Sequence, residues 1–279
     1  MIEDLLKAAL LGIIQGLTEF LPVSSTGHLI LAEEILGVDE DRYGLAFDAA
    51  LHLGTLIALL AYFGSRWIDL ARAGLRSLSE RSLADEQGRI AWLIVLGTVP
   101  AAIIGFLFQD TIEDAFRSPA LVATMLIAFS AVFVLAEAAG KRTRHMRDLN
   151  RVDALIVGFA QAGALVPGVS RSGATISAGM LRNVDRAEAA TFAFLLSAPI
   201  IAGAVASQMP GVVRDFADGT LGWNDAAFFL TGFACAGVVG YVSIAFLLRF
   251  LVTNTLIPFA VYRVALGLLV FVLLIAGAI

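Results

Sequence analysis

Six stretches of the chain are long and apolar enough to cross a lipid bilayer as single helices. Such a helix needs roughly 20 mostly apolar residues. Hydrophobic residues make up 59% of the sequence and charged residues 15%, whereas soluble domains carry about 25% charged residues. We therefore expect a single all-α polytopic membrane domain over residues 1–279. The six stretches lie near 47–63, 90–108, 120–139, 190–209, 226–247 and 256–277.

Two further apolar stretches, near 5–36 and 154–180, are interrupted in the middle by proline, glycine and hydroxyl residues. Pro22 and Pro167 each remove a backbone donor and bias the preceding residue away from helix. Freed backbone groups at membrane depth are tolerated only where protein or a wet cavity covers them. We therefore expect two re-entrant hairpins, each entering and leaving on one side of the membrane.

The basic residues follow this topology. If only the six stretches cross, segments 64–89, 140–153, 181–189 and 248–255 share one side, and this side carries most of the Lys and Arg residues. The positive-inside rule makes it cytoplasmic and places both chain termini outside.

The two interrupted stretches resemble each other, and three crossing stretches follow each of them. An odd number of crossings gives the two copies opposite orientations. We expect two inverted-topology repeats, about 1–140 and 153–279, each a re-entrant broken-helix hairpin plus three transmembrane helices, with a site at their interface. Chance alignment of small residues is the alternative. Gly12, Gln15, Ser24 and Gly27 align with Gly158, Gln161, Ser170 and Gly173.

The first interruption concentrates polar groups at membrane depth. Gln15 and Glu19 are four residues apart and point from one helical face. The break adds Ser24, Ser25, Thr26, Gly27 and His28. Because a carboxylate and an imidazole are costly inside a membrane, they indicate a functional site. An interfacial glutamate and a structural histidine are the alternatives.

The second interruption is typical of a phosphate site. Arg171 lies between Ser170 and Ser172, with Gly173 and Thr175 downstream. Its guanidinium matches phosphate oxygens, and the helix that restarts after the break points its positive end at an anion. The alternative is that Arg171 forms a structural ion pair with a carboxylate. An ion pair between Arg171 and Glu19 is compatible with both the phosphate site and the structural role.

Three other polar residues carry weaker predictions. Arg263 is as readily a structural partner of Asp48 as a ligand contact. His52 either lines the cavity or, as we favour, packs structurally, and His145 is expected to be ordinary surface.

The segments GLTEFLPVSSTGH and PGVSRSGATISAGML, with PFAVYR at 258–263, resemble the undecaprenyl-pyrophosphate phosphatase family, the bacitracin-resistance proteins of bacterial inner membranes. The resemblance covers effectively the whole chain. It implies removal of the terminal phosphate of a polyprenyl pyrophosphate lipid with a divalent cation, Mg²⁺ or Ca²⁺. This reaction recycles the lipid carrier for peptidoglycan synthesis. The resemblance therefore also implies roles in cell shape and in antibiotic resistance.

The same resemblance implies catalytic roles for Glu19, Ser25, His28 and Arg171. The cation would lie on Glu19 and Gln15, although an amide such as Gln15 cannot act as a base. Ser25, His28 or water could be the nucleophile, with His28 or Glu19 as base. The residues expected to bind substrate are Gln15, Ser24, Thr26, Gly27, Ser170, Ser172, Gly173 and Thr175.

The partners expected are the lipid substrate and the membrane. The net charge of −5 argues against nucleic acid, and a homodimer is left open. A transporter or flippase of a lipid phosphate or small anion is the alternative function, because inverted repeats are also typical of transporters.

Overall fold

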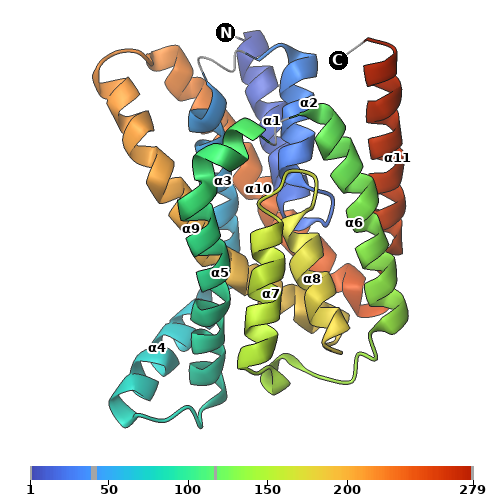
Figure 1. Ribbon diagram of the computed structural model, residues 1–279. Coiled ribbons are helices and arrows are strands. Elements are labelled where there is room, and N and C mark those ends of the chain that lie inside the picture. Colours follow the sequence, from blue (N-terminus) through green and yellow to red (C-terminus); the bar gives the residue numbers. More distant parts are fainter. Residues whose placement is uncertain (1, 39–42, 116–117, 278–279) are drawn as a thin grey trace.

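The computed structural model describes residues 2–38, 43–115 and 118–277, and these residues form a helical bundle (Figure 1). The N-terminal helices are α1 (Ile2–Phe20), α2 (Ser25–Leu36), α3 (Gly44–Tyr62), α4 (Gly64–Glu80), α5 (Glu86–Ala115) and α6 (Pro119–Ala139). A 3-10 turn (Met146–Asp148) precedes α7 (Arg151–Gly163), α8 (Arg171–Leu181), α9 (Arg186–Ala217), α10 (Trp223–Thr253) and α11 (Ile257–Ile275).

Five of the described helices are long and apolar enough to cross a membrane: α5 as far as Phe108, α6, α9, α10 and α11. The stretch predicted near 47–63 forms α3, which counts as a sixth span only together with α4, at 78° to it. Side chains such as Leu268 and Val272 of α11 are more than half exposed, as expected where lipid is the solvent. The chain is therefore a multi-pass membrane protein.

The segment 64–89 is not simply a loop, because most of it forms the helix α4. One stripe of this helix, which includes Leu70 and Ala73, is buried against the protein. Charged residues alternate with apolar ones along this helix. Its average hydropathy is therefore low, although its apolar residues recur with the period of a helix. Treating this segment as a connection was therefore wrong.

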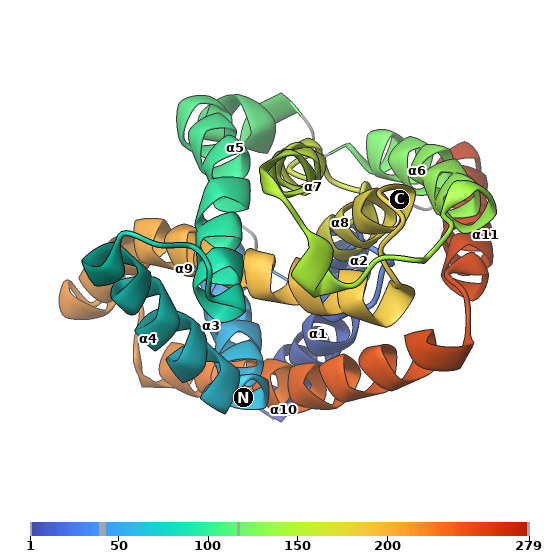
Figure 2. The same cartoon turned by 90° about the horizontal axis from the view of Figure 1, so that it is seen from below.

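Both interrupted stretches form helical hairpins, as the sequence predicts. In Figure 1, α1 and α2 enter from the end of the bundle where both termini lie, whereas α7 and α8 enter from the opposite end. Their turns meet: the Gly168 amide donates to Ser24 Oγ over 3.2 Å, and Ser172 Oγ donates to the Leu21 carbonyl over 3.1 Å. Figure 2 shows the hairpins within a ring of longer helices.

Glycines set how closely each hairpin approaches that ring. A Cβ atom on Gly12 would lie 2.4 Å from the Gly232 carbonyl oxygen of α10, and one on Gly158 would lie 2.3 Å from that of Gly97 in α5. Small residues are what allow membrane helices to pack backbone against backbone. These two contacts therefore fix the depth at which the two turns meet.

Candidate active site

The meeting turns enclose a polar cavity of about 200 Å³. Its walls come from both hairpins, from α3 and from α9, so it depends on segments far apart in the chain. The polar side chains that line it include Thr18, Glu19, Ser25, His52, Gln161 and Arg171.

The Glu19 carboxylate is the centre of the hydrogen bonds in this cavity, and the side chain is nearly fully buried. One carboxylate oxygen is paired with the Arg171 guanidinium. The other accepts hydrogen bonds from Ser25 Oγ over 2.7 Å and from Gln15 Nε2 over 3.2 Å. The structural pair between Glu19 and Arg171 therefore forms, and it forms inside the cavity.

Ser25 has the geometry of a nucleophile beside its base. Its hydroxyl donates directly to a carboxylate, and a base within hydrogen-bond reach is what an unactivated serine requires. Ser25 is the first residue of α2, so its side chain lies where this helix begins at the cavity.

Arg171 occupies the same position in the second hairpin, as the first residue of α8. A guanidinium has five N–H donors in a planar fork, so Arg171 can hold Glu19 and a phosphate oxygen together. The N-termini of α2 and α8 thus lie at one cavity, and each favours an anion there.

The residues that precede these helix starts have unusual backbones. Ser24 has φ 76° and ψ 97°, and Ser170 has φ 73° and ψ 108°. Positive φ is uncommon for residues other than glycine and is often found at functional sites. Ser170 Oγ also accepts from the Gly173 amide over 3.2 Å, which caps α8.

Several residues predicted to bind substrate lie behind the cavity instead of along it. Ser172 bonds to the first hairpin, and Thr175 Oγ1 donates to the Arg171 carbonyl over 2.8 Å. A Cβ on Gly27 would lie 2.9 Å from Val122 Cγ1, and one on Gly173 would lie 2.1 Å from Phe133 Cζ. These glycines allow close packing against α6.

His28 also points away from the cavity, and its ring is not among the lining groups. Its Nδ1 lies 2.8 Å from the Ser24 carbonyl oxygen and its Nε2 lies 2.7 Å from Tyr262 Oη. Because a carbonyl only accepts, Nδ1 carries the donated proton and Nε2 of the neutral ring accepts from the tyrosine. The structure therefore does not bring His28 to Glu19, and it places the ring as a support for the Ser24 turn.

His52 lines the cavity, although the sequence favoured a packing role for it. Its Nε2 lies 3.8 Å from Glu19 Oε2, and its Nδ1 lies 2.8 Å from the Asp48 carbonyl oxygen. The sequence signal for a role in the cavity is a titratable side chain within an apolar stretch. The 3.8 Å separation is longer than a hydrogen bond, so His52 is a polar neighbour of the carboxylate.

Arg263 is structural, but the predicted partner was wrong. It donates to the Gly168 carbonyl over 2.9 Å, to the Met125 carbonyl and to Ser130, and it lies over the Phe133 ring. Asp48 is not among these partners, because α11 packs on α6 while Asp48 belongs to α3. Arg263 thereby holds Gly168, which has φ 91° in the second turn.

His145 is exposed, as predicted, and is paired with Glu188 over 2.7 Å. Within the described part of the chain, no three His, Cys, Asp or Glu side chains gather closely enough to hold a metal ion by themselves. The Glu19 carboxylate accepts from Gln15 Nε2 and from Ser25 Oγ.

Comparison with known proteins gives the family. The family model described as bacitracin resistance protein BacA matches residues 8–269. The undecaprenyl-diphosphatase of Rubrobacter xylanophilus is 49% identical and covers 97% of this chain and 98% of its own length. Those of Geotalea daltonii and Trichlorobacter lovleyi are 43% and 44% identical, over 96% and 98% of this chain and 98% of each relative. The chain is a member of the bacitracin resistance protein BacA family.

Proposed function

We propose that this chain is an undecaprenyl-diphosphatase of the bacterial plasma membrane, which releases inorganic phosphate and returns the monophosphate carrier to cell-wall synthesis. Its family membership supports this function. The observation that carries it is the contact of Ser25 and Arg171 with one buried carboxylate, where two helix N-termini begin. Charge neutralisation, a nucleophile and a proton acceptor are what phosphoryl transfer needs.

In the mechanism that this geometry favours, Ser25 Oγ attacks the terminal phosphorus while Glu19 accepts the hydroxyl proton. The bond from that phosphorus to the bridging oxygen breaks, and the lipid monophosphate leaves. Water then attacks the phosphoserine, which releases inorganic phosphate and restores Ser25. Arg171 and the N-termini of α2 and α8 stabilise the charge on the phosphoryl oxygens. Direct attack by water deprotonated at Glu19 is the alternative.

A divalent cation, Mg²⁺ or Ca²⁺, fits this site through Glu19 and Gln15. The Gln15 Oε1 atom is buried without a hydrogen-bond partner, and its amide lies against the Glu19 carboxylate. Mg²⁺ is commonly held by one or two carboxylates together with substrate phosphates. When bound, such an ion would neutralise phosphate charge. Glu19 and Gln15 would provide hard oxygen ligands for it, and Arg171 would remain available to the phosphate.

An apolar cleft of about 400 Å³ between α5 and α9 supports a lipid substrate. It shares Leu165, Ile200 and Ala204 with the polar cavity, so the two spaces border the same side chains. A polyprenyl chain in this cleft would place its pyrophosphate at the cavity. A small water-soluble phosphate ester would gain nothing from such an apolar wall.

The two hairpins are proposed to belong to inverted repeats, with both termini outside the cell. Ser24 and Ser170, which align in the sequence, share the same unusual backbone. The aligned Gly12 and Gly158 also make matching contacts, with α10 and α5 respectively. The basic residues at the α4 end of the bundle support the orientation.

The function is tested with purified protein, undecaprenyl pyrophosphate and Mg²⁺ in detergent micelles. We expect equal amounts of inorganic phosphate and lipid monophosphate. Protein that moves the intact lipid across a vesicle membrane, without releasing phosphate, would instead support the transporter alternative.

The apolar cleft predicts a dependence on substrate chain length. Gly203 lines the cleft but not the polar cavity, and a Cβ there would meet open space. Gly203→Trp should fill the cleft and lower phosphate release from the long polyprenyl substrate by at least about tenfold, the cost of excluding a few buried methylenes. Release from a short prenyl pyrophosphate should change little. Gly211→Trp, at an equally open position of α9 outside the cleft, is the matched control.

His52 predicts a graded response to substitution. His52→Leu removes a polar neighbour of a buried charge and should lower phosphate release by about tenfold or more. His52→Gln keeps a polar group near Glu19 and should retain most of the rate. Rates of both purified variants at saturating substrate check this, and a Gln variant as inactive as the Leu variant would point to proton transfer by His52.

A further inference from the structure

A second cleft, of about 880 Å³, lies at the α4 end of the bundle. It runs between the end of α4, the start of α5 and the start of α7. Its walls are mostly apolar, and they include Leu78, Leu93, Leu96 and Trp92. None of its lining residues belongs to the catalytic cavity.

The position of α4 places this cleft at the surface of the membrane. α4 turns by 78° from α3 and leaves the bundle at the end opposite both termini (Figure 1). Besides its buried stripe, α4 exposes Ile68, Leu75 and Leu78, each more than half accessible. Helices with such a pattern lie in the lipid headgroup region. Trp92, whose Nε1 donates to Ser77 Oγ over 2.8 Å, is also typical of that region.

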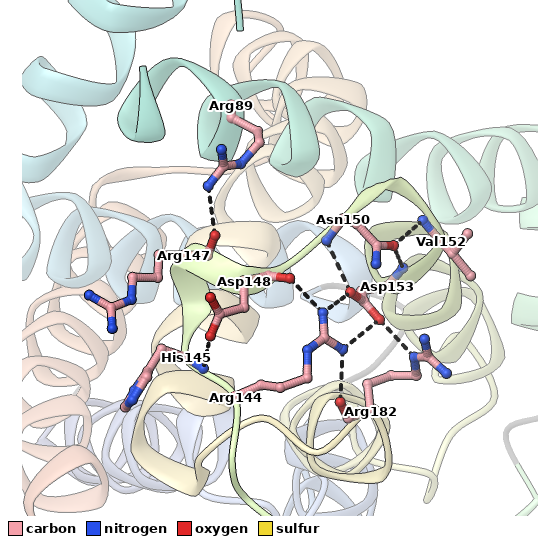
Figure 3. A network of polar contacts seen from close by, with 9 residues as sticks. All are labelled: Arg89, Arg144, His145, Arg147, Asp148, Asn150, Val152, Asp153 and Arg182. Carbon is pink, nitrogen blue, oxygen red and sulfur yellow. Dashed lines mark hydrogen bonds and ion pairs between the residues drawn. The ribbon is translucent and has the colours of Figure 1, made fainter. Parts of the chain in front are cut away.

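Among the described residues, three arginines line the cleft and no acidic side chain does. Arg81 directly follows α4 and has φ 50°, Arg151 begins α7, and Arg89 of α5 donates to the Arg147 carbonyl over 2.6 Å. Figure 3 shows this last contact.

Two carboxylates of the adjoining segment 144–153 are engaged elsewhere. Asp153 pairs with Arg144 over 2.6 Å and with Arg182 over 2.7 Å, and Asp148 accepts from the His145 amide (Figure 3). These two carboxylates therefore do not neutralise the arginines that line the cleft.

We propose that this cleft binds an anionic glycerophospholipid of the surrounding membrane. Its phosphate lies against Arg81, Arg89 and Arg151, and an acyl chain lies along Leu78, Leu93 and Leu96. Basic pockets between membrane helices bind anionic headgroups in this way. The bound lipid joins the start of α7 to the α4–α5 turn. α7 carries Gln161 to the polar cavity that contains Glu19. By holding the start of α7, the lipid therefore stabilises the α7–α8 hairpin on which that cavity depends.

The test measures binding of phosphatidylglycerol and of phosphatidylcholine with the same chains to the detergent-solubilised protein, by native mass spectrometry and by the shift in melting temperature. We expect selective binding and stabilisation by phosphatidylglycerol. The double variant Arg81→Gln/Arg151→Gln should bind it roughly 25-fold more weakly, at about fivefold per arginine. Arg72→Gln/Arg76→Gln is the matched control, since both residues are exposed on α4 outside the cleft.

A second variant tests the apolar wall without changing charge. Leu96→Trp should fill the cleft and weaken phosphatidylglycerol binding, while phosphate release in micelles continues. Equal binding of the two phospholipids, or equal losses in the cleft and control variants, would overturn the proposal. So would displacement of phosphatidylglycerol by undecaprenyl phosphate at much lower concentration, which would identify the cleft as a product site.

Discussion

Glu19→Gln is expected to lower the rate of phosphate release by about 10²- to 10⁴-fold, the range that a positioned general base contributes. The amide keeps the shape of the side chain but cannot take the Ser25 proton. It also removes the negative charge that holds Arg171. Loss of the base is measured as phosphate release at saturating lipid and Mg²⁺. Loss of the negative charge is measured separately, as binding of a non-hydrolysable lipid diphosphonate.

The two readouts assign the role of Glu19. A base acts on the rate, so the variant should still bind the diphosphonate. A cation ligand acts on binding as well, so the variant would then need far more Mg²⁺ to bind the diphosphonate. Ordinary turnover in Glu19→Gln would exclude both roles. His28 and His52 would then be the candidates for proton transfer.

Gln15→Glu is the matched change on the same helical face. Gln15 Nε2 lies 3.2 Å from Glu19 Oε2, so a second carboxylate there would be repelled unless a cation or proton lies between them. We expect the variant to fold and to depend more steeply on divalent cation, because it offers a second hard anionic oxygen.

The hairpins and their meeting could be predicted because their signals are local. Pro22, Pro167 and the surrounding hydroxyl residues interrupt apolar stretches in a way that admits few structures inside a bilayer. The contact between Ser25 and Glu19 also follows from one short segment, in which helix α1 ends and α2 restarts after a four-residue turn.

What could not be predicted was which way side chains point once distant helices pack. His28 stands beside Ser25 in the sequence, yet its ring contacts Tyr262 of α11. His52 is separated from the motif by a whole helix, yet its Nε2 lies 3.8 Å from Glu19 Oε2. Gly173 carries the signature of a phosphate loop, but the Phe133 ring explains its lack of a side chain. Each of these depends on a tertiary contact that spacing alone does not encode.

Arg171→Lys should reduce phosphate release by about 10²-fold, within the range found when one preorganised donor to a transition-state oxygen is removed. Lysine keeps the positive charge and can still pair with Glu19, so the variant should fold. What it loses is the planar fork, with which a guanidinium can hold a carboxylate and a phosphate oxygen together.

The comparison of Arg171→Lys with Arg171→Gln separates geometry from charge. If the fork matters, both variants should be slow, and Lys should recover only the part that a point charge supplies. If Arg171 merely neutralises Glu19, Lys should restore near-normal turnover while Gln does not. Melting temperatures provide the control, because loss of the ion pair alone leaves a buried carboxylate without its partner and lowers stability more in the Gln variant than in the Lys variant. A Lys variant that is both fast and stable would show that Arg171 acts on Glu19 and not on the phosphate.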